Sequence, residues 1–285
     1  MIKVVKFGGS SLASAQQFVK VGNIIRSDEA RKYVVPSAPG KRNSKDTKVT
    51  DMLYQCYALA EEDKDFSGAL KKIQERYNSI INGLNLNLSL DEQFKTIAEN
   101  FKKKAGSDYA ASRGEFLNGI VMAEYLGYEF IDAAEVIVFD EDGEFESEKT
   151  NKILSERLAK CERAVVPGFY GAKEDGTVKT FSRGGSDITG SIVAKAVHAD
   201  MYENWTDVSG FLVADPRIIE NPESIKVITY RELRELSYMG ATVLHEDAVF
   251  PVRKEGIPIN IRNTNAPEDE GTLIVESTCR QSAYT

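Results

Sequence analysis

Lys6 stands near the end of a short apolar stretch, residues 2–7, and two glycines follow that stretch. A lysine in such a stretch is rarely tolerated unless an anion meets its ammonium group. Gly8 and Gly9 allow backbone N–H groups to approach an anion closely, because glycine has no side chain. A cation beside a glycine turn is therefore a candidate site for phosphate.

Three further glycine-bearing loops occur, at residues 167–171, 182–187 and 208–210. Each follows a predicted strand or precedes a predicted helix. The carboxyl ends of parallel strands share one edge of a sheet, so we expect these loops to line one crevice. A helix N-terminus adds a dipole that favours an anion. The sequence has neither a GxxxxGK[ST] loop nor a GxGxxG motif after its first strand, which excludes the two commonest phosphate-binding signatures.

Three more charged residues are candidates, and each also has a structural interpretation. Arg183 and Asp187 flank a glycine pair and could form an ion pair at a helix cap. Glu115 follows Ser112, Arg113 and Gly114 and is predicted to open a helix, where an acidic side chain favours the dipole. Lys6 is the candidate for which a functional role is the stronger interpretation.

The 285-residue chain has 42% apolar and 28% charged residues, which excludes a disordered protein. With 36 basic and 44 acidic residues its net charge is −8, which disfavours general binding to nucleic acids. Cys56, Cys161 and Cys279 are widely spaced and distant from His198 and His245, so neither a disulfide framework nor a zinc site is expected. No segment is long and apolar enough for a signal or membrane helix. We expect a cytoplasmic protein with no membrane partner.

The first elements form a βαβ unit. Residues 2–7 and 33–35 are predicted strands, and Ser14 is the predicted N-cap of the helix between them. Such a unit implies a parallel sheet with a right-handed crossover. Residues 51–111 show helical periodicity and indicate a helical insertion with a loop at 82–87.

The remaining elements alternate between the two types, which is typical of the α/β class. A helix capped by Ser186 or Asp187 is expected after the glycine pair. A hairpin turn is expected at 174–177. The other predicted helices cover residues 115–126 and 230–238, and the other predicted strands cover residues 129–132, 136–138, 164–166, 201–205, 258–261 and 272–275.

Six motifs, in order across the chain, resemble the aspartokinases of the amino-acid kinase family. They are KFGGSS (6–11), SRGE (112–115), SRGGSDITG (182–190), WTDVSG (205–210), DPR (215–217) and MGATVLH (239–245). The resemblance implies the amino-acid kinase fold, an αβα sandwich around a mostly parallel sheet, here with a helical insertion. It implies one catalytic domain over 1–285, with an aspartate-binding N-lobe at about 1–180 and an ATP-binding C-lobe at about 181–275. The ACT regulatory domains of the family are absent from this chain, so we expect a catalytic fragment of an enzyme that is a homo-oligomer at full length.

The resemblance also implies roles for individual residues. Lys6 and Asp187 would be catalytic, with Lys6 on the transferred phosphoryl group. Aspartate would be held by Ser37, Thr50, Glu115 and Arg183. ATP would be contacted by Lys6, Gly8, Gly9, Ser10, Gly184, Gly185, Ser186, Thr206, Asp207, Leu212, Arg217, Thr242 and Val243. Two of these depart from the family pattern, because many aspartokinases have tyrosine at the place of Leu212 and lysine at the place of Thr242.

The implied reaction is transfer of the ATP γ-phosphoryl group to the β-carboxylate of L-aspartate, giving 4-phospho-L-aspartate on the route to lysine, threonine and methionine. A carboxylate is already ionised at pH 7, so this transfer needs no general base. Mg²⁺ would be held mainly by the ATP phosphates. One alternative is another enzyme of the same fold, such as acetylglutamate, glutamate 5- or uridylate kinase, against which SRGE and WTDVSG argue. The other is a non-catalytic ligand-binding fragment.

Overall fold

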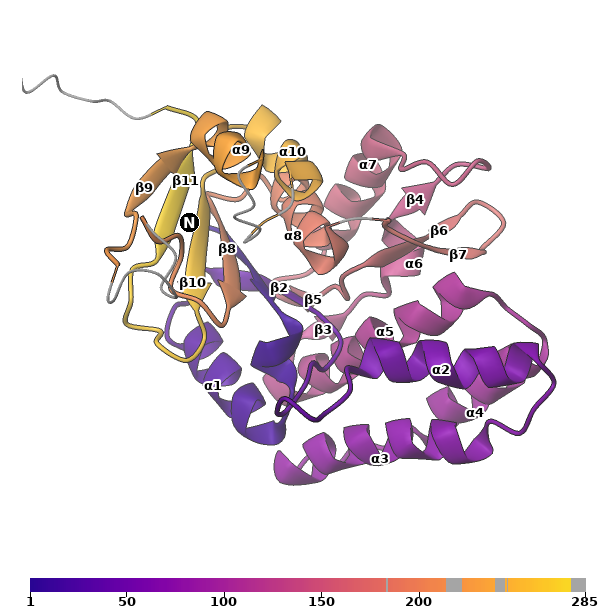
Figure 1. Ribbon diagram of the computed structural model, residues 1–285. Coiled ribbons are helices and arrows are strands. Elements are labelled where there is room, and N and C mark those ends of the chain that lie inside the picture. Colours follow the sequence, from indigo (N-terminus) through magenta and orange to yellow (C-terminus); the bar gives the residue numbers. More distant parts are fainter. Residues whose placement is uncertain (183, 214–221, 239–243, 245, 278–285) are drawn as a thin grey trace, which may run out of the picture.

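One sheet of eight strands forms the centre of the molecule (Figure 1). The computed structural model describes residues 1–182, 184–213, 222–238, 244 and 246–277. The strand order is β3-β5-β2-β1-β8-β10-β11-β9, and every neighbouring pair is parallel except β10 and β11. The strands are β1 Lys3–Phe7, β2 Arg31–Pro36, β3 Glu129–Phe130, β5 Ala164–Val165, β8 Met201–Thr206, β9 Val227–Thr229, β10 Ile259–Asn263 and β11 Thr272–Val275.

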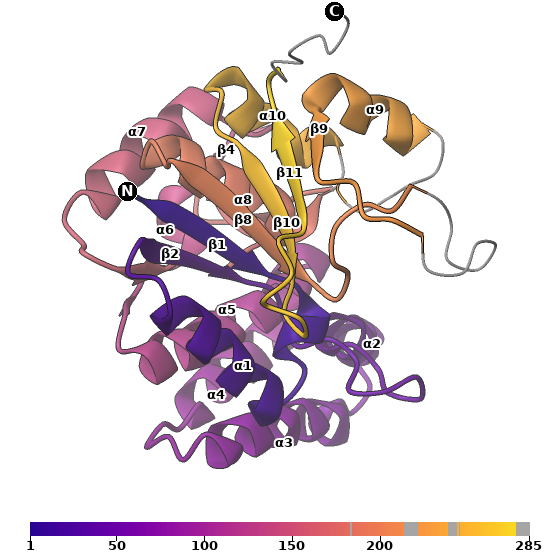
Figure 2. The same cartoon turned by 90° about the vertical axis from the view of Figure 1, so that its left-hand side faces the viewer.

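Helices cover both faces of this sheet, which gives the αβα sandwich expected from the sequence (Figures 1 and 2). On one side lie α1 Ala15–Arg26, α2 Val49–Glu61, α3 Ser67–Gly83, α4 Asp91–Lys102 and α5 Ser107–Leu126, with the 3-10 turn η1 Gly9–Leu12 leading into α1. On the other lie α6 Ala133–Val136, α7 Ser147–Leu158, α8 Gly185–Ala196, α9 Tyr230–Tyr238 and α10 Glu246–Lys254. A small second sheet joins β4 Val138–Phe139, β6 Tyr170–Lys173 and β7 Val178–Thr180.

The alternation of side chains along β1 decides where Lys6 points. Val4 belongs to the apolar core beneath α8, whereas Val5 and Phe7 belong to the core beneath α1 to α5. Successive side chains of a strand point to opposite faces, so Lys6 shares the α8 face with Val4. In the parallel register of β1 and β8, Lys6 lies opposite Asn204. The ammonium group of Lys6 therefore lies on the same side of the sheet as the N-terminus of α8.

Several predictions from the sequence are confirmed. β1, α1 and β2 form the expected βαβ unit, and the Ser14 hydroxyl accepts a hydrogen bond from the backbone N–H of Gln17 at the start of α1. The helical insertion is present as α2, α3, α4 and the first part of α5. The turn at 174–177 joins β6 and β7 as an antiparallel hairpin.

Three local predictions were wrong. α5 runs unbroken from Ser107 to Leu126, so Glu115 lies in the middle of a helix and does not open one. The N-cap of α8 is Gly184, which has φ +74° and makes no side-chain cap, so neither Ser186 nor Asp187 is the cap. Val136 was predicted to begin a strand but is the last residue of the short helix α6, and the strand begins only at Val138. The helix forms here because the Asp132 side chain caps its N-terminus by accepting a hydrogen bond from the N–H of Ala134.

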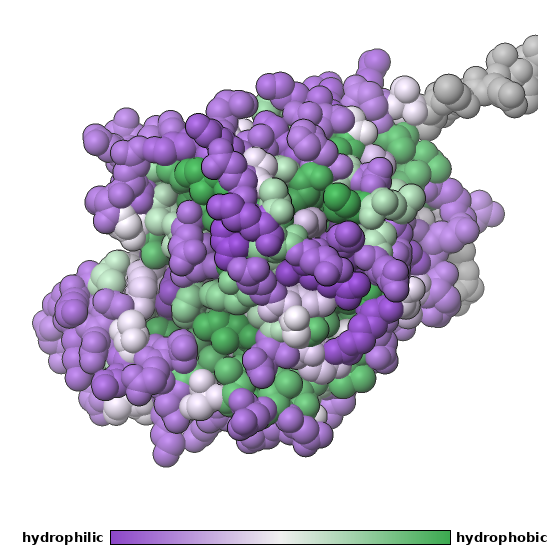
Figure 3. Space-filling view, turned by 180° about the vertical axis from the view of Figure 1, so that it is seen from behind, coloured by the Kyte–Doolittle hydropathy of each residue, from purple (hydrophilic) through white to green (hydrophobic). Residues whose placement is uncertain are grey.

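Hydrophilic side chains dominate the rim of the face opposite to Figure 1, and apolar ones gather in separate areas across its middle (Figure 3). Among the described residues no helix is both long and apolar enough to cross a membrane. Cys56 and Cys161 are buried free thiols, and Cys279 lies outside the described residues.

Candidate active site

The carboxyl ends of β1, β2 and β8 lie side by side at one edge of the sheet (Figure 2). The chain leaves β1 through Gly8 and Gly9, and it leaves β2 through the loop that begins at Ser37. These loops are therefore neighbours in space although the residues are far apart in sequence, as the parallel sheet predicts.

The Lys6 ammonium group is buried and paired. Its side chain is 9% exposed, and Nζ lies 2.6 Å from Asp187 Oδ1 in the first turn of α8. The amide of Asn204 donates a hydrogen bond of 2.9 Å to the same oxygen. Asp187 is therefore held by residues of two neighbouring strands, and it fixes the position of the Lys6 ammonium group. The two residues predicted to be catalytic, Lys6 and Asp187, are thus in direct contact.

The glycine turn after β1 is packed against its neighbours by backbone contacts. The N–H of Gly8 donates to the carbonyl of Trp205 (3.0 Å), and a Cβ atom at Gly8 would lie 3.6 Å from Lys6 Nζ. The carbonyl of Gly9 accepts from the N–H of Gly40 (2.8 Å). Ser10 follows in η1. The predicted phosphate cradle is thus directly beside the lysine.

A second glycine pair forms the start of α8. Gly184 and Gly185 have φ values of +74° and +46°, which side chains rarely adopt, so glycine is required there. Ser186 is buried against Gly168, where any Cβ atom would overlap it. The N-terminus of α8 lies beside Lys6, because Asp187 of its first turn contacts that lysine, and its dipole suits an anion.

Glu115 is a buried carboxylate with an unused oxygen. It is 6% exposed and accepts a hydrogen bond from the backbone of Ala38, but Oε2 is buried without a hydrogen-bond partner. Burial raises the pKa of Glu115 to about 8, although Arg113 and Lys6 oppose that shift. A buried acceptor without a partner is costly, and a cationic ligand would satisfy it.

The two smaller residues predicted to hold aspartate also lie at this edge. Ser37 follows β2, with its N–H bonded to the carbonyl of Phe7 and its carbonyl bonded to the amide of Asn118. Thr50 is half-buried in the first turn of α2, directly after Val49, whose N–H bonds to the carbonyl of Pro39. Ser37, Thr50 and Glu115 thus converge on the loop between β2 and α2.

The residues predicted to contact the nucleotide divide into two groups. Thr206 ends β8, Asp207 is exposed beside it, and the side chain of Leu212 is also exposed at 38%. The nucleotide contacts predicted at Arg217, Thr242 and Val243 lie outside the described part of the chain. So does Arg183, which is predicted to hold aspartate.

Sequence reasoning missed three residues of this site. Asn204 holds Asp187, and its register opposite Lys6 on the next strand is the signal that could have identified it. Asn118 is one helical turn after Glu115 and has a buried Oδ1 without a partner. Phe169 has a φ of +83°, a strained conformation for a bulky residue, and its N–H bonds to Thr189 of α8. Nothing in the local sequence signals that strain.

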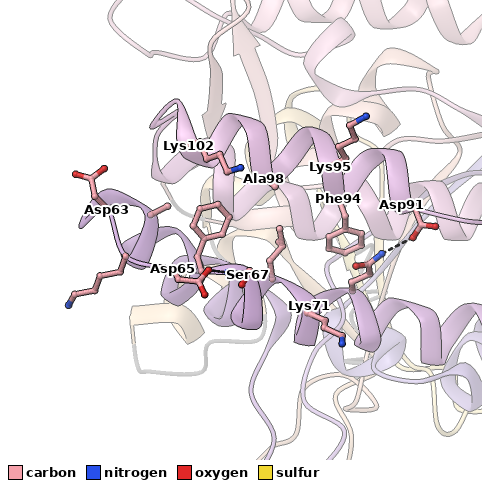
Figure 4. Close-up of a pocket in the computed structure, with 14 residues that line it drawn as sticks. Asp63, Asp65, Ser67, Lys71, Asp91, Phe94, Lys95, Ala98 and Lys102 are labelled. Carbon is pink, nitrogen blue, oxygen red and sulfur yellow. Dashed lines mark hydrogen bonds between the residues drawn. The ribbon is translucent and has the colours of Figure 1, made fainter.

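A separate cavity of about 730 Å³ lies between α2, α3 and α4 (Figure 4). Phe66, Leu70 and Phe94 form part of its apolar wall, and lysines and aspartates surround it. None of the residues predicted to bind aspartate or ATP lines it. Among the described residues no cluster of three His, Cys, Asp or Glu side chains is arranged to hold a metal ion.

The model of the amino acid kinase family matches residues 1–263. Among curated proteins, aspartokinase 3 of Bacillus subtilis (strain 168) is 43% identical over 288 residues, which is 96% of this chain and 63% of that protein. The chain therefore spans somewhat less than two thirds of the length of this relative.

Solved structures similar to this chain also include aspartate kinases. The aspartate kinase of Clostridium acetobutylicum has a TM-score of 0.93 and 56% identity, and the match covers 98% of this chain and 64% of that one. E. coli aspartokinase III has a TM-score of 0.82 both in its complex with aspartate and ADP (24% identity) and in its complex with lysine and aspartate (26%). Each of these two matches covers 98% of this chain and 66% of the other. At 24% identity the first of these likenesses concerns the fold alone.

Proposed function

The chain belongs to the amino acid kinase family, and we propose that it transfers the γ-phosphoryl group of ATP to the β-carboxylate of L-aspartate. The observation that carries this proposal is the orphaned Oε2 of Glu115, a buried carboxyl oxygen beside the loop of Ser37 and within the electrostatic influence of Lys6. Glu115 would thus bind a ligand cation, and the glycine turn beside Lys6 would bind phosphate next to it.

Recognition of the acceptor follows from these groups. The α-ammonium group of aspartate would bind Glu115 Oε2 and keep the carboxylate ionised in the complex. Arg183 suits the α-carboxylate, because its planar guanidinium group can form two parallel hydrogen bonds with it. Ser37 and Thr50 supply neutral polar groups on the opposite loop. With both α-groups held, the β-carboxylate is the free end that reaches the phosphate cradle.

The transfer itself requires positioning and charge neutralisation. A β-carboxylate oxygen forms a bond to the γ-phosphorus, the bond from that phosphorus to the β,γ-bridging oxygen breaks, and ADP leaves with the electron pair. Lys6 and the N–H groups near Gly8, Gly9 and Ser10 would stabilise the charge spread over the equatorial oxygens. Asp187 holds Lys6 in place and keeps its ammonium group from the solvent.

The nucleotide would lie over the C-lobe, beside the N-terminus of α8 and the end of β8. Gly184, Gly185 and Ser186 would face the phosphates, and Thr206, Asp207 and Leu212 the rest of the nucleotide. Mg²⁺ would be held by ATP oxygens and water and would supply further charge neutralisation. The lobe boundary near residue 180, the homo-oligomer and the cytoplasmic location stay predictions.

Residues of this site argue against two other functions. Another small-molecule kinase of the family would use the same phosphate cradle, but the buried carboxyl group of Glu115, which a cationic partner would ionise, suits an ammonium group better than an acylated amine or a pyrimidine. A non-catalytic fragment would have no use for the buried pair of Lys6 and Asp187, which costs free energy to desolvate.

A panel of acceptors tests the proposal. ADP release from ATP is measured with L-aspartate, L-glutamate, N-acetylglutamate and UMP, and we expect turnover with L-aspartate alone. Lys6→Ala should lower kcat by about 10²–10³, because one contact that stabilises the transition state is lost. Lys3→Ala on the same strand is the matched control, since Lys3 pairs with Asp28 and Glu203 at the far end of β1. Turnover with another acceptor, or more than a third of kcat left in Lys6→Ala, would contradict the proposal.

A further inference from the structure

Arg76 is a buried arginine of α3 that reaches out of the helical insertion to the active-site loops. Its residue exposure is 5%, and its guanidinium group binds three partners. Nη1 lies 2.8 Å from Asp46 Oδ2, and Nη2 donates to the carbonyls of Gly40 (2.6 Å) and Ala13 (3.3 Å). Ala13 directly follows η1, and Gly40 and Asp46 belong to the loop between β2 and α2.

The two loops that Arg76 joins also contact one another through their backbones. The N–H of Gly40 donates to the carbonyl of Gly9, and a Cβ atom at Gly9 would lie 2.9 Å from the carbonyl oxygen of Ala38. A Cβ atom at Gly40 would lie 2.5 Å from the carbonyl carbon of Gly9. Neither backbone can move toward the other, so a shift of the 37–48 loop is transmitted directly to the turn after β1.

Stability alone does not account for a charge at this place. Burial lowers the pKa of Arg76, which shows that desolvation acts against its charged form. Replacing a buried ion pair by a well-packed apolar side chain is often neutral or stabilising. Asp46, moreover, already has a second cationic partner in Arg42, whose hydrogen bond lowers the pKa of that carboxyl group. The feature specific to Arg76 is its bonds to backbone carbonyls of two different loops.

We propose that Arg76 is a positioning residue that fixes the acceptor loop of residues 37–48 against the phosphate turn of residues 8–12, and so sets the approach of the acceptor carboxylate to the phosphoryl group. This inference rests on the proposed kinase function. Arg76 itself contacts neither substrate. It acts through Gly40 and Ala13, whose carbonyls it holds on either side of the contact with Gly9.

The test compares Arg76→Met with Arg31→Met. Arg31 is a matched control because it is equally buried, pairs with Glu203 and bonds to the carbonyl of Ile24, but lies at the far end of β2. Both variants should lose thermal stability. Only Arg76→Met should lower kcat by about 10–100-fold, with smaller changes in the KM of ATP and aspartate, because a misplacement of about 1 Å between reacting groups costs that much.

Amide hydrogen exchange gives a readout that does not depend on turnover. In Arg76→Met the amides of Gly40 and Val49 should exchange at least about ten-fold faster than in the wild type, and in Arg31→Met they should not. Arg76→Lys keeps the charge but loses the planar guanidinium group, so we expect its kcat and its amide exchange rates to be intermediate between those of the wild type and Arg76→Met. If the methionine variant does not fold, Arg76→Lys replaces it in the comparison.

Three outcomes are distinct. Lower thermal stability with kcat within about three-fold of wild type, or unchanged exchange at Gly40, would overturn the role of Arg76. A wild type without activity on aspartate would overturn the proposed function, and the exchange comparison would still decide whether Arg76 holds the loop. Equal losses of kcat in the Arg31 and Arg76 variants would show a general effect of stability and would also overturn the inference.

Discussion

The variant Glu115→Gln should make the protein more stable and at the same time disable it. Glu115 is buried, and its burial raises its pKa from 4.5 to about 8. Between these two pH values the folded state binds a proton that the unfolded state has lost. The free energy of unfolding therefore falls as pH rises from about 4.5 to about 8, and glutamine, which does not ionise, removes this dependence.

The size of the effect follows from the same shift. A difference between 4.5 and about 8 corresponds to an upper bound of roughly 5 kcal/mol at pH 8 and above. Oε2 has no partner, so the glutamine amide will also be incompletely hydrogen-bonded, at a cost of about 1–3 kcal/mol. At pH 8.5 we therefore expect Glu115→Gln to raise the free energy of unfolding by about 2–4 kcal/mol. At pH 4.5 we expect no gain, because removing the ionisable group has little effect there and the incomplete hydrogen bonding of the amide is not offset.

Urea unfolding of both proteins at pH 5, 7 and 8.5 measures this difference. Glu99→Gln, an exposed position on α4, is the control and should show no difference that grows with pH. In the same variant the KM of aspartate should rise by about 100-fold or more, because a charge-assisted contact with the α-ammonium group is lost. A gain in stability that does not grow with pH would refute the argument about the buried carboxylate. An unchanged KM would refute its role in binding.

Two further predictions concern the substrate clamp and the contact between the loops. Arg183→Lys should raise the KM of aspartate much more than the KM of ATP, because lysine cannot form the planar fork with a carboxylate, and equal effects in steady-state kinetics would move Arg183 to the phosphate side. Gly40→Ala should lower kcat at least ten-fold, because its Cβ atom would lie 2.5 Å from the carbonyl carbon of Gly9 and push the phosphate turn aside. An alanine variant with wild-type kcat would show that the turn after β1 tolerates displacement.

The layered fold and the cluster of charged residues were accessible from the sequence because they depend on simple periodicities. Strand, helix and strand in the first 36 residues imply a parallel sheet, and a parallel sheet brings its loops to one edge. The apolar alternation around Lys6 is likewise visible in the sequence. These inferences hold because each uses a local pattern that tertiary packing reinforces.

The remaining features depend on contacts between distant residues. The predicted start of a helix at Glu115 failed because the apolar periodicity of α5 is masked by small residues, and the helix is buried on nearly every side. The cap of α8 was missed because Gly184 uses backbone conformation in place of a side chain. Asn204 and Arg76 were missed because strand register and the path of the 37–48 loop decide their partners, and neither can be read from local sequence.

If the α-ammonium and α-carboxylate groups of aspartate are held and its β-carboxylate faces the phosphate, the phosphoryl group of the product must be on the β-carboxylate. The wild-type protein is incubated with ATP and L-aspartate, and the acyl phosphate is reduced with borohydride as it forms. Reduction of the β-acyl phosphate gives homoserine, and we expect homoserine in proportion to the ADP released. Recovery of 3-amino-4-hydroxybutanoate, the product of α-phosphorylation, or ADP release without any reduced amino acid, would contradict it.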